Sequence, residues 1–194
     1  MSLFDEAIRL TDIANSADPR VENDNGDAVP QELLYSQRMT AWLNRLEPAA
    51  GEALKLAVRA QHLRRWEIRR DTYPAGRAGY HAWRRELSLF HAEKAGELLA
   101  EAGYDDDMIA RVQALIRKEN LRSDPETQTL EDVACLVFLD HYFEHFLPQH
   151  DAAKVIEIVR KTWRKMSARG QAAALELKLA PEALELVKQA LGEE

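Results

Sequence analysis

The sequence predicts an all-α fold, a single domain of about eight helices over residues 1–194, and three observations support this. Apolar residues recur at spacings of three and four along almost every segment, which is the period of a helix. Pro and Gly residues separate these segments, and no stretch alternates as a half-buried strand does. A chain of this length can bury a sizeable core without disulfides or metal.

The first half of the chain has clear helix boundaries. The stretch 16–31 holds Asn25-Gly26 and Pro30 and is expected to be a loop. The next helix stops before Pro48. The loop at 67–78 is longer than a minimal helix–helix turn, which favours a functional role. Helices are therefore expected at 2–15, 32–46, 49–66 and 79–102.

The second half of the chain also has clear signals for where helices begin and end. The acidic run 105–107 suits a helix N-terminus, and Asp124-Pro125 marks a loop near 120–128. An apolar helix stops before Pro148, and Pro181 suits the first position of the last helix. The expected helices are 105–119, 128–146, 151–168 and 181–191.

Composition and charge exclude several classes of protein. A single cysteine, Cys135, excludes a disulfide scaffold and a Cys-rich zinc module. Neither a signal peptide nor an apolar run long enough to cross a bilayer is visible, so we expect a cytoplasmic protein without a membrane partner. The net charge of −7 argues against general coating of nucleic acid. A homo-oligomer is compatible with this composition.

Positive charge is concentrated in residues 59–94, where nine Lys and Arg face four acids. A second basic cluster lies at 160–169. Solvated helix faces would explain both clusters, but a local anion site, most simply for phosphate, is the sharper interpretation. The candidate substrate-binding residues are Arg64, Arg65, Arg69, Arg70, Arg84 and Lys118.

Four ionisable residues interrupt apolar helix stripes and are candidate metal ligands. They are His62, His91, Glu119 and Asp132. A buried carboxylate is costly unless it is paired or binds a metal, and this donor set suits zinc, manganese, iron or nickel. Glu119 and Asp132 are also the candidate catalytic carboxylates. Hydrogen-bonded core residues and helix caps are the alternative explanation.

Two other features are weaker candidates. His141 and His145 lie one turn apart and have the spacing of metal ligands, although a metalloprotease motif is absent. Cys135 lies among apolar residues, which favours a buried inert thiol over a nucleophile.

Several segments of the sequence resemble a known family. The stretches ELLYSQRMTAWL, AQHLRRWEI, RDTYPAGRAGY, FHAEKAGELL, QTLEDVACLVFL and RKTWRKMS are similar to the bacterial and fungal family named domain of unknown function 4202. The resemblance covers nearly the whole chain. The family name implies no activity.

A weaker resemblance is to the HD superfamily of metal-dependent phosphohydrolases, and it implies an HD-like orthogonal bundle. His62 stands at the dyad histidine, His91 and Glu119 at optional positions, and Asp132 at the final aspartate. Leu63 replaces the dyad aspartate, and the first histidine has no equivalent. The set would hold one metal or be a degenerate site.

These observations favour a metal-dependent hydrolase of a small phosphorylated metabolite or nucleotide. An iron oxygenase on the same scaffold is a second hypothesis. A non-catalytic helical module that binds phosphate or RNA is a third, since Trp66, Tyr73, Tyr80 and Trp83 alternate with arginines and could stack bases. These aromatic residues could instead pack the loop against the core.

Overall fold

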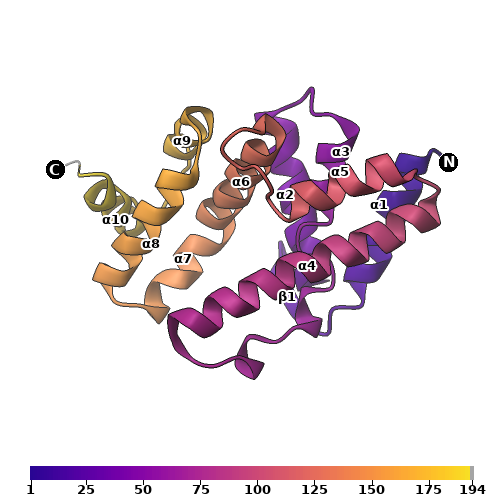
Figure 1. Ribbon diagram of the computed structural model, residues 1–194. Helices are drawn as coiled ribbons and strands as arrows, with labels where there is room; N and C mark the ends of the chain where they lie inside the picture. The colour runs from indigo at the N-terminus through magenta and orange to yellow at the C-terminus, as the bar shows by residue number, and fades with distance from the viewer. Residues whose placement is uncertain (193–194) are drawn as a thin grey trace.

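The computed structural model describes residues 1–192, and helices dominate it (Figure 1). The predicted all-α class is therefore confirmed. Ten α-helices occur in the described part of the chain: α1 (Leu3–Ser16), α2 (Gln31–Leu46), α3 (Glu52–Arg59), α4 (Gly76–Ala102), α5 (Asp106–Ile116), α6 (Pro125–Val137), α7 (Phe143–Phe146), α8 (Ala152–Lys165), α9 (Ala168–Leu175) and α10 (Pro181–Leu191).

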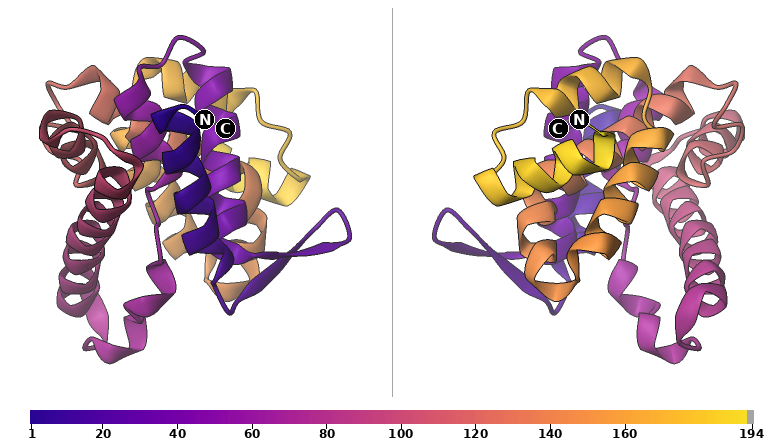
Figure 2. Two further views of the ribbon diagram at one scale, coloured as in Figure 1. Left: turned by 90° about the vertical axis from the view of Figure 1, so that its right-hand side faces the viewer. Right: turned by 90° about the vertical axis from the view of Figure 1, so that its left-hand side faces the viewer.

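The expected loop at 16–31 contains a β-hairpin, which corrects the expectation that no strand forms. Strands β1 (Val21–Asp24) and β2 (Asp27–Pro30) pair antiparallel. Asn25 and Gly26 join them with positive φ angles of 54° and 101°, the geometry of a two-residue hairpin turn. The hairpin extends away from the helices in Figure 2. Its strands are too short and polar to show an apolar alternation in the sequence.

The helix expected at 49–66 is shorter in the structure. Helix α3 ends at Arg59, and the chain then turns twice before two short 3-10 segments, Arg65–Glu67 and Arg70–Thr72. Arg64 adopts the left-handed conformation, with φ of 53°. Its backbone N–H donates a hydrogen bond to the side-chain oxygen of buried Asn15, 3.0 Å away. This tertiary contact outweighs local helix propensity.

Two more boundaries differ from expectation. Helix α6 begins at Pro125, where the Asp124 side chain accepts hydrogen bonds from the first turn. It passes into a π-helical turn at Phe138–Tyr142 before α7. Helix α9 was not predicted as a separate helix; it begins after Ser167, whose side chain caps it.

The core lies where α2, α3 and α6 pack together. Helices α4 and α5 pack on each other, and α5 also contacts α3. Helix α8 packs on α6 and α10, and these elements form the C-terminal side of the molecule (Figure 1). Leu43, Leu63, Leu136 and Phe143 are fully buried between these elements.

Within residues 1–192, none of the helices combines the length and the hydropathy that a membrane-spanning segment needs.

Candidate anion-binding site

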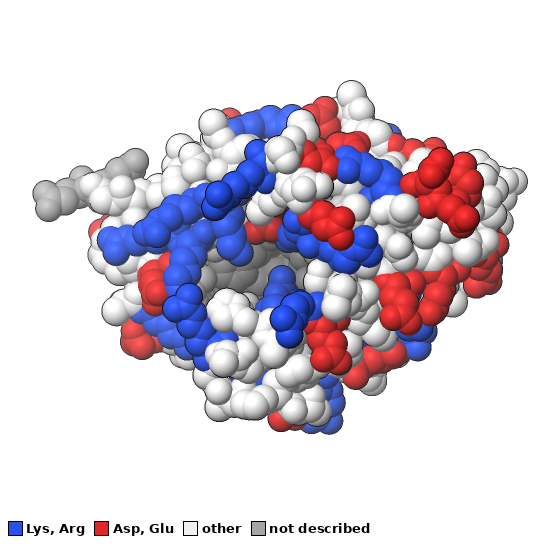
Figure 3. All heavy atoms as spheres, viewed as in Figure 1, with Lys and Arg blue, Asp and Glu red and all other residues white. Residues whose placement is uncertain are grey.

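A hollow of about 360 Å³ opens on the face seen in Figure 3, with Lys and Arg atoms around its rim. Its walls come from α2, the turn after α3, α4, α6, the π turn and α8, together with Lys118. The hollow therefore joins segments from residue 31 to residue 165. Polar residues and the aromatic rings of Tyr35, Tyr80, Phe138 and Tyr142 line it.

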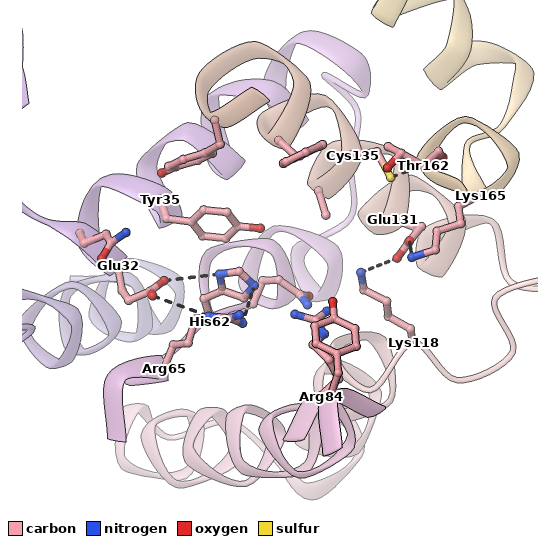
Figure 4. A pocket seen from close by; sticks show the side chains of 16 residues that line it. Glu32, Tyr35, His62, Arg65, Arg84, Lys118, Glu131, Cys135, Thr162 and Lys165 are labelled. Atoms are coloured by element: carbon pink, nitrogen blue, oxygen red, sulfur yellow. Dashed lines mark hydrogen bonds and ion pairs between the residues drawn. The ribbon is translucent and has the colours of Figure 1, made fainter. Parts of the chain in front are cut away.

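Four cations and two carboxylates line the hollow. Glu131 forms ion pairs with Lys118 and Lys165, the second at 3.4 Å. Although burial opposes ionisation, these lysines hold the pKa of Glu131 below its usual value. Glu32 lies 3.9 Å from Arg65. Because four cations face two carboxylates, the lining is positive overall; Figure 4 shows these side chains and their ion pairs.

Arg84 differs from the other cations of the hollow. Within the described residues, its guanidinium has neither a hydrogen-bond partner nor a carboxylate within ion-pair distance. Every other cation of the lining pairs with Glu32 or Glu131. Arg84 is thus the group of the hollow with unused capacity to bind an anion.

Arg65 lies beside Arg84 in the hollow. Its guanidinium stacks 4.8 Å above the Trp83 ring and is mostly buried. Burial and the positive charge of Arg84 lower the pKa of Arg65. Two guanidinium groups in one hollow repel each other, and a bound anion would reduce that repulsion.

His62 stands on the wall between Glu32 and Arg65. A nitrogen of Arg65 lies 3.3 Å from His62 Nε2, and because arginine can only donate, Nε2 accepts. The proton is then on Nδ1, 3.4 Å from a carboxylate oxygen of Glu32. Tyr35 stacks on the imidazole with centroids 4.0 Å apart. Burial, and then the charge of Arg65, lower the pKa of His62 well below its usual value, so the ring is neutral.

His91 lies behind His62, with ring centroids 5.8 Å apart. Its Nδ1 lies 2.8 Å from the backbone oxygen of Leu63 and donates to it. Burial, followed by the neighbouring His62, lowers the pKa of His91 to about 3. The Nε2 atom has no partner within the described structure, and neither has the side-chain oxygen of Gln61.

The structure does not assemble the predicted four-ligand metal site. In residues 1–192, no three His, Cys, Asp or Glu side chains gather as metal ligands, and this includes His141 and His145. His62 and His91 lie close together. Glu119 is half exposed and pairs with Arg117.

Asp132 is buried for a structural reason. Its carboxylate accepts hydrogen bonds from the Ser167 N–H at 2.8 Å and the Ser167 hydroxyl at 2.5 Å. Gln128 donates a third at 2.9 Å. Asp132 thus holds Ser167, the N-cap residue of α9, against α6, so its burial joins two distant segments.

The six predicted substrate-binding residues divide into two groups. Arg65, Arg84 and Lys118 line the hollow. Arg64 pairs with Glu67, Arg69 pairs with Asp71, and Arg70 donates to backbone oxygens of the 73–76 turn. These last three stabilise their own loop and lie outside the hollow.

The aromatic residues in and beside the loop lie in different places. The Trp83 indole N–H donates to the backbone oxygen of Ile68, which packs the loop against α4. Trp66 and Tyr73 line a neighbouring open groove, whose arginines include Arg69 and Arg70. Tyr80 is 46% exposed and stands at the rim of the hollow.

Sequence reasoning missed several residues of the hollow. Glu32 and Tyr35 come from the first two turns of α2, and Tyr142 comes from the π turn. The spacing of Glu32 and Tyr35 places them on one helix face, but no stripe distinguishes that face from a solvated one. Lys165 belongs to the second basic cluster at 160–169, so the sequence did indicate positive charge at this position. Cys135 also lines the wall, and burial raises the pKa of its thiol to about 12, which disfavours the nucleophilic thiolate form.

Comparison with known proteins gives a family and nothing more specific. No curated protein and no solved structure matches the chain. The resemblance to the HD superfamily accordingly gains no support. One family profile matches residues 5–187, which is nearly the whole chain. The chain therefore belongs to the family described as domain of unknown function DUF4202.

Proposed function

We propose that the hollow binds a small phosphorylated metabolite or nucleotide through its phosphate group. The observation that carries this proposal is the pair formed by Arg65 and Arg84, in which Arg84 has no anionic partner among the described residues. Guanidinium groups bind phosphate oxygens through paired N–H donors. Lys118 also lines the hollow and adds a third cation.

The dimensions and chemistry of the hollow suit such a ligand. A volume of about 360 Å³ falls in the range of small-molecule sites. Tyr80 and Tyr142 supply aromatic surface near the cations, and Gln31 supplies an amide. The phosphate would lie near Arg65 and Arg84, and the organic part of the ligand would face these rings.

The described residues do not fit the resident metal that the HD resemblance implied. Asp132 is committed to Ser167, and Glu119 points to Arg117. A hydrolytic metal and an oxygenase iron both need a gathered ligand set, which these residues do not provide. The proposed function therefore includes no step through a metal.

Calorimetric titration of the wild-type protein with inorganic phosphate and nucleoside monophosphates tests the proposal. Arg84→Gln should weaken binding about 10- to 100-fold, because a charge-assisted hydrogen bond contributes roughly 1.5–3 kcal/mol. Arg84→Lys should weaken binding less, because lysine keeps the positive charge but cannot offer two parallel N–H donors to the phosphate. Arg69→Gln is the matched control, since Arg69 already pairs with Asp71 outside the hollow.

Two results would overturn the proposal. The first is no binding of either ligand class at millimolar concentration. The second is equal weakening by Arg84→Gln and Arg69→Gln, which would place any anion site elsewhere. Binding of a short single-stranded RNA without binding of small phosphates would instead favour the RNA-binding alternative, through the groove that holds Trp66 and Tyr73.

A further inference from the structure

A small chamber adjoins the hollow, and two of the residues that line it carry buried hydrogen-bond acceptors without donors. Its volume is about 40 Å³. His91 and Gln61 both line it and are 2% and 5% exposed. His91 Nε2 and the Gln61 side-chain oxygen have no partner within the described residues. Buried polar atoms are seldom left unpaired, so a small hydrogen-bond donor at the chamber would satisfy both of them.

The protonation of His91 defines what that occupant must be. Because Nδ1 donates to the Leu63 carbonyl oxygen at 2.8 Å, Nε2 carries a lone pair. The Gln61 oxygen is likewise an acceptor. The occupant must therefore donate hydrogens to both atoms. Water does this, and the chamber exceeds the roughly 10–15 Å³ of space that one water molecule needs.

The chamber and the hollow share a wall. Five side chains line both of them: Gln61, His62, Arg65, Arg84 and Lys118. A phosphate bound by Arg65 and Arg84 would therefore stand between the two spaces. Its organic substituent would point to the wide hollow, because the chamber is too small to receive it. The chamber would then face the phosphorus atom from the opposite side.

We propose that the chamber holds the water molecule that attacks the phosphorus atom of a phosphomonoester bound in the hollow, so that the protein is a phosphomonoester hydrolase independent of metal. This rests on the proposed phosphate site. His91 and Gln61 orient the water, and His91 Nε2 accepts its proton. Arg65 and Arg84 stabilise the charge on the phosphoryl oxygens in the transition state.

The reaction balances in atoms and electrons. The water oxygen forms a bond to phosphorus, and the bond between phosphorus and the ester oxygen breaks. The electron pair of the broken bond stays on the leaving oxygen, which takes a proton from solvent at the mouth of the hollow. One water proton remains on the new phosphate, and His91 returns the other to solvent. Nothing is oxidised or reduced.

The bound phosphate changes the protonation of His91 in the required direction. In the empty site, burial, the neighbouring His62 ring and the charge of Arg65 disfavour its imidazolium form, while Glu32 favours it. Arg84 and Lys118 also line the chamber. A phosphate dianion among these cations adds negative charge nearby and so raises the proton affinity of Nε2.

Steady-state hydrolysis of p-nitrophenyl phosphate, sugar phosphates and nucleoside monophosphates, all in EDTA, tests the inference. His91→Asn keeps a donor toward the Leu63 oxygen but removes Nε2 from the chamber. It should lower kcat at least 100-fold and leave KM and the affinity for inorganic phosphate within threefold. His81→Asn is the matched control, because His81 is exposed on the same helix, bonds to Arg77, and should have full activity.

The possible failures are distinguishable. If inorganic phosphate does not bind the wild type, the proposed function itself fails. If phosphate binds and none of the esters is hydrolysed, only the present inference fails. Activity that EDTA removes and a divalent metal restores would also overturn it, as would full activity in His91→Asn. A high-resolution crystal structure should show a water molecule bonded to His91 Nε2 and the Gln61 oxygen, and a dry chamber would contradict the inference.

Discussion

Asp132 illustrates how a buried carboxylate can be structural at the scale of one residue. It accepts three hydrogen bonds, two of them from Ser167. A Cβ on Gly170 would come within 2.7 Å of its side chain, so α9 lies directly against it. Asp132→Ala should lower the free energy of unfolding by about 2–4 kcal/mol, since it leaves the Ser167 N–H and hydroxyl without their acceptor, and each unsatisfied group costs roughly 1–3 kcal/mol. Urea unfolding measures this.

The matched variant for this prediction is Glu119→Ala. Glu119 is half exposed and pairs only with Arg117, so its loss should cost less than about 1 kcal/mol. Affinity for phosphate should stay within threefold in the folded fraction of both variants. A stable Asp132→Ala protein that loses ligand binding would contradict the structural role.

His91 should make stability depend on pH. Its pKa is near 3 in the fold and near 6.5 in the unfolded chain. Between these values the unfolded chain binds one more proton, so stability falls as pH decreases from 6.5 toward 3. The slope is about 1.4 kcal/mol per pH unit, or roughly 2 kcal/mol between pH 6.5 and 5. Urea unfolding of His91→Asn should show a slope smaller by up to this amount; an unchanged slope would contradict a buried, neutral His91.

At the scale of elements, local signals located helices better than they located the turns between them. Pro48, Gly103, Pro148 and Pro181 each lie next to a helix end, as predicted. The sequence could not show that α3 stops at Arg59, because the contact that holds the next turn comes from Asn15, far away in the chain. Helix propensity describes neighbours along the chain and contains no such partner.

The hairpin has a sequence signal in its turn, although its strands show no apolar alternation. Asn25-Gly26 is the strongest short signal for a two-residue turn. Gly26 has φ of 101°, where a side chain is strained. Gly26→Ala should therefore speed amide exchange in 21–30 and cost about 1–2 kcal/mol locally. Asn25→Gly is the matched control and should leave exchange nearly unchanged, because glycine accepts its positive φ. Equal exchange in both variants would show that the turn does not determine the hairpin.

At the scale of the whole molecule, the candidate site could be predicted only in part. Residues 59–94 supplied Arg65 and Arg84, and the charge count pointed to them. The count could not separate them from Arg64, Arg69 and Arg70, because that distinction depends on which acids fold against each arginine. Ion pairing between an arginine and an acid depends on the tertiary structure, and it cannot be inferred from the pattern of apolar residues along a single helix.

The position of the hollow predicts that a bound phosphate stabilises the entire fold. The lining joins α2, α4, α6 and α8, so a ligand there links segments that are distant in the chain. A ligand at 100 times its dissociation constant adds about 2.7 kcal/mol, which for a chain of this size raises Tm by roughly 5–10 °C. Calorimetric melting with and without phosphate measures the rise.

Arg84→Gln separates this effect from ordinary salt stabilisation. Because Arg84 lacks an ion-pair partner in the described structure and repels Arg65, the variant without ligand should melt within about 2 °C of the wild type, or slightly higher. The rise with phosphate should largely disappear in this variant and persist in Arg69→Gln. Sodium chloride at matched ionic strength controls for screening. A large loss of Tm in Arg84→Gln without ligand would show that Arg84 stabilises the fold itself, and the unpaired cation would then no longer argue for a ligand.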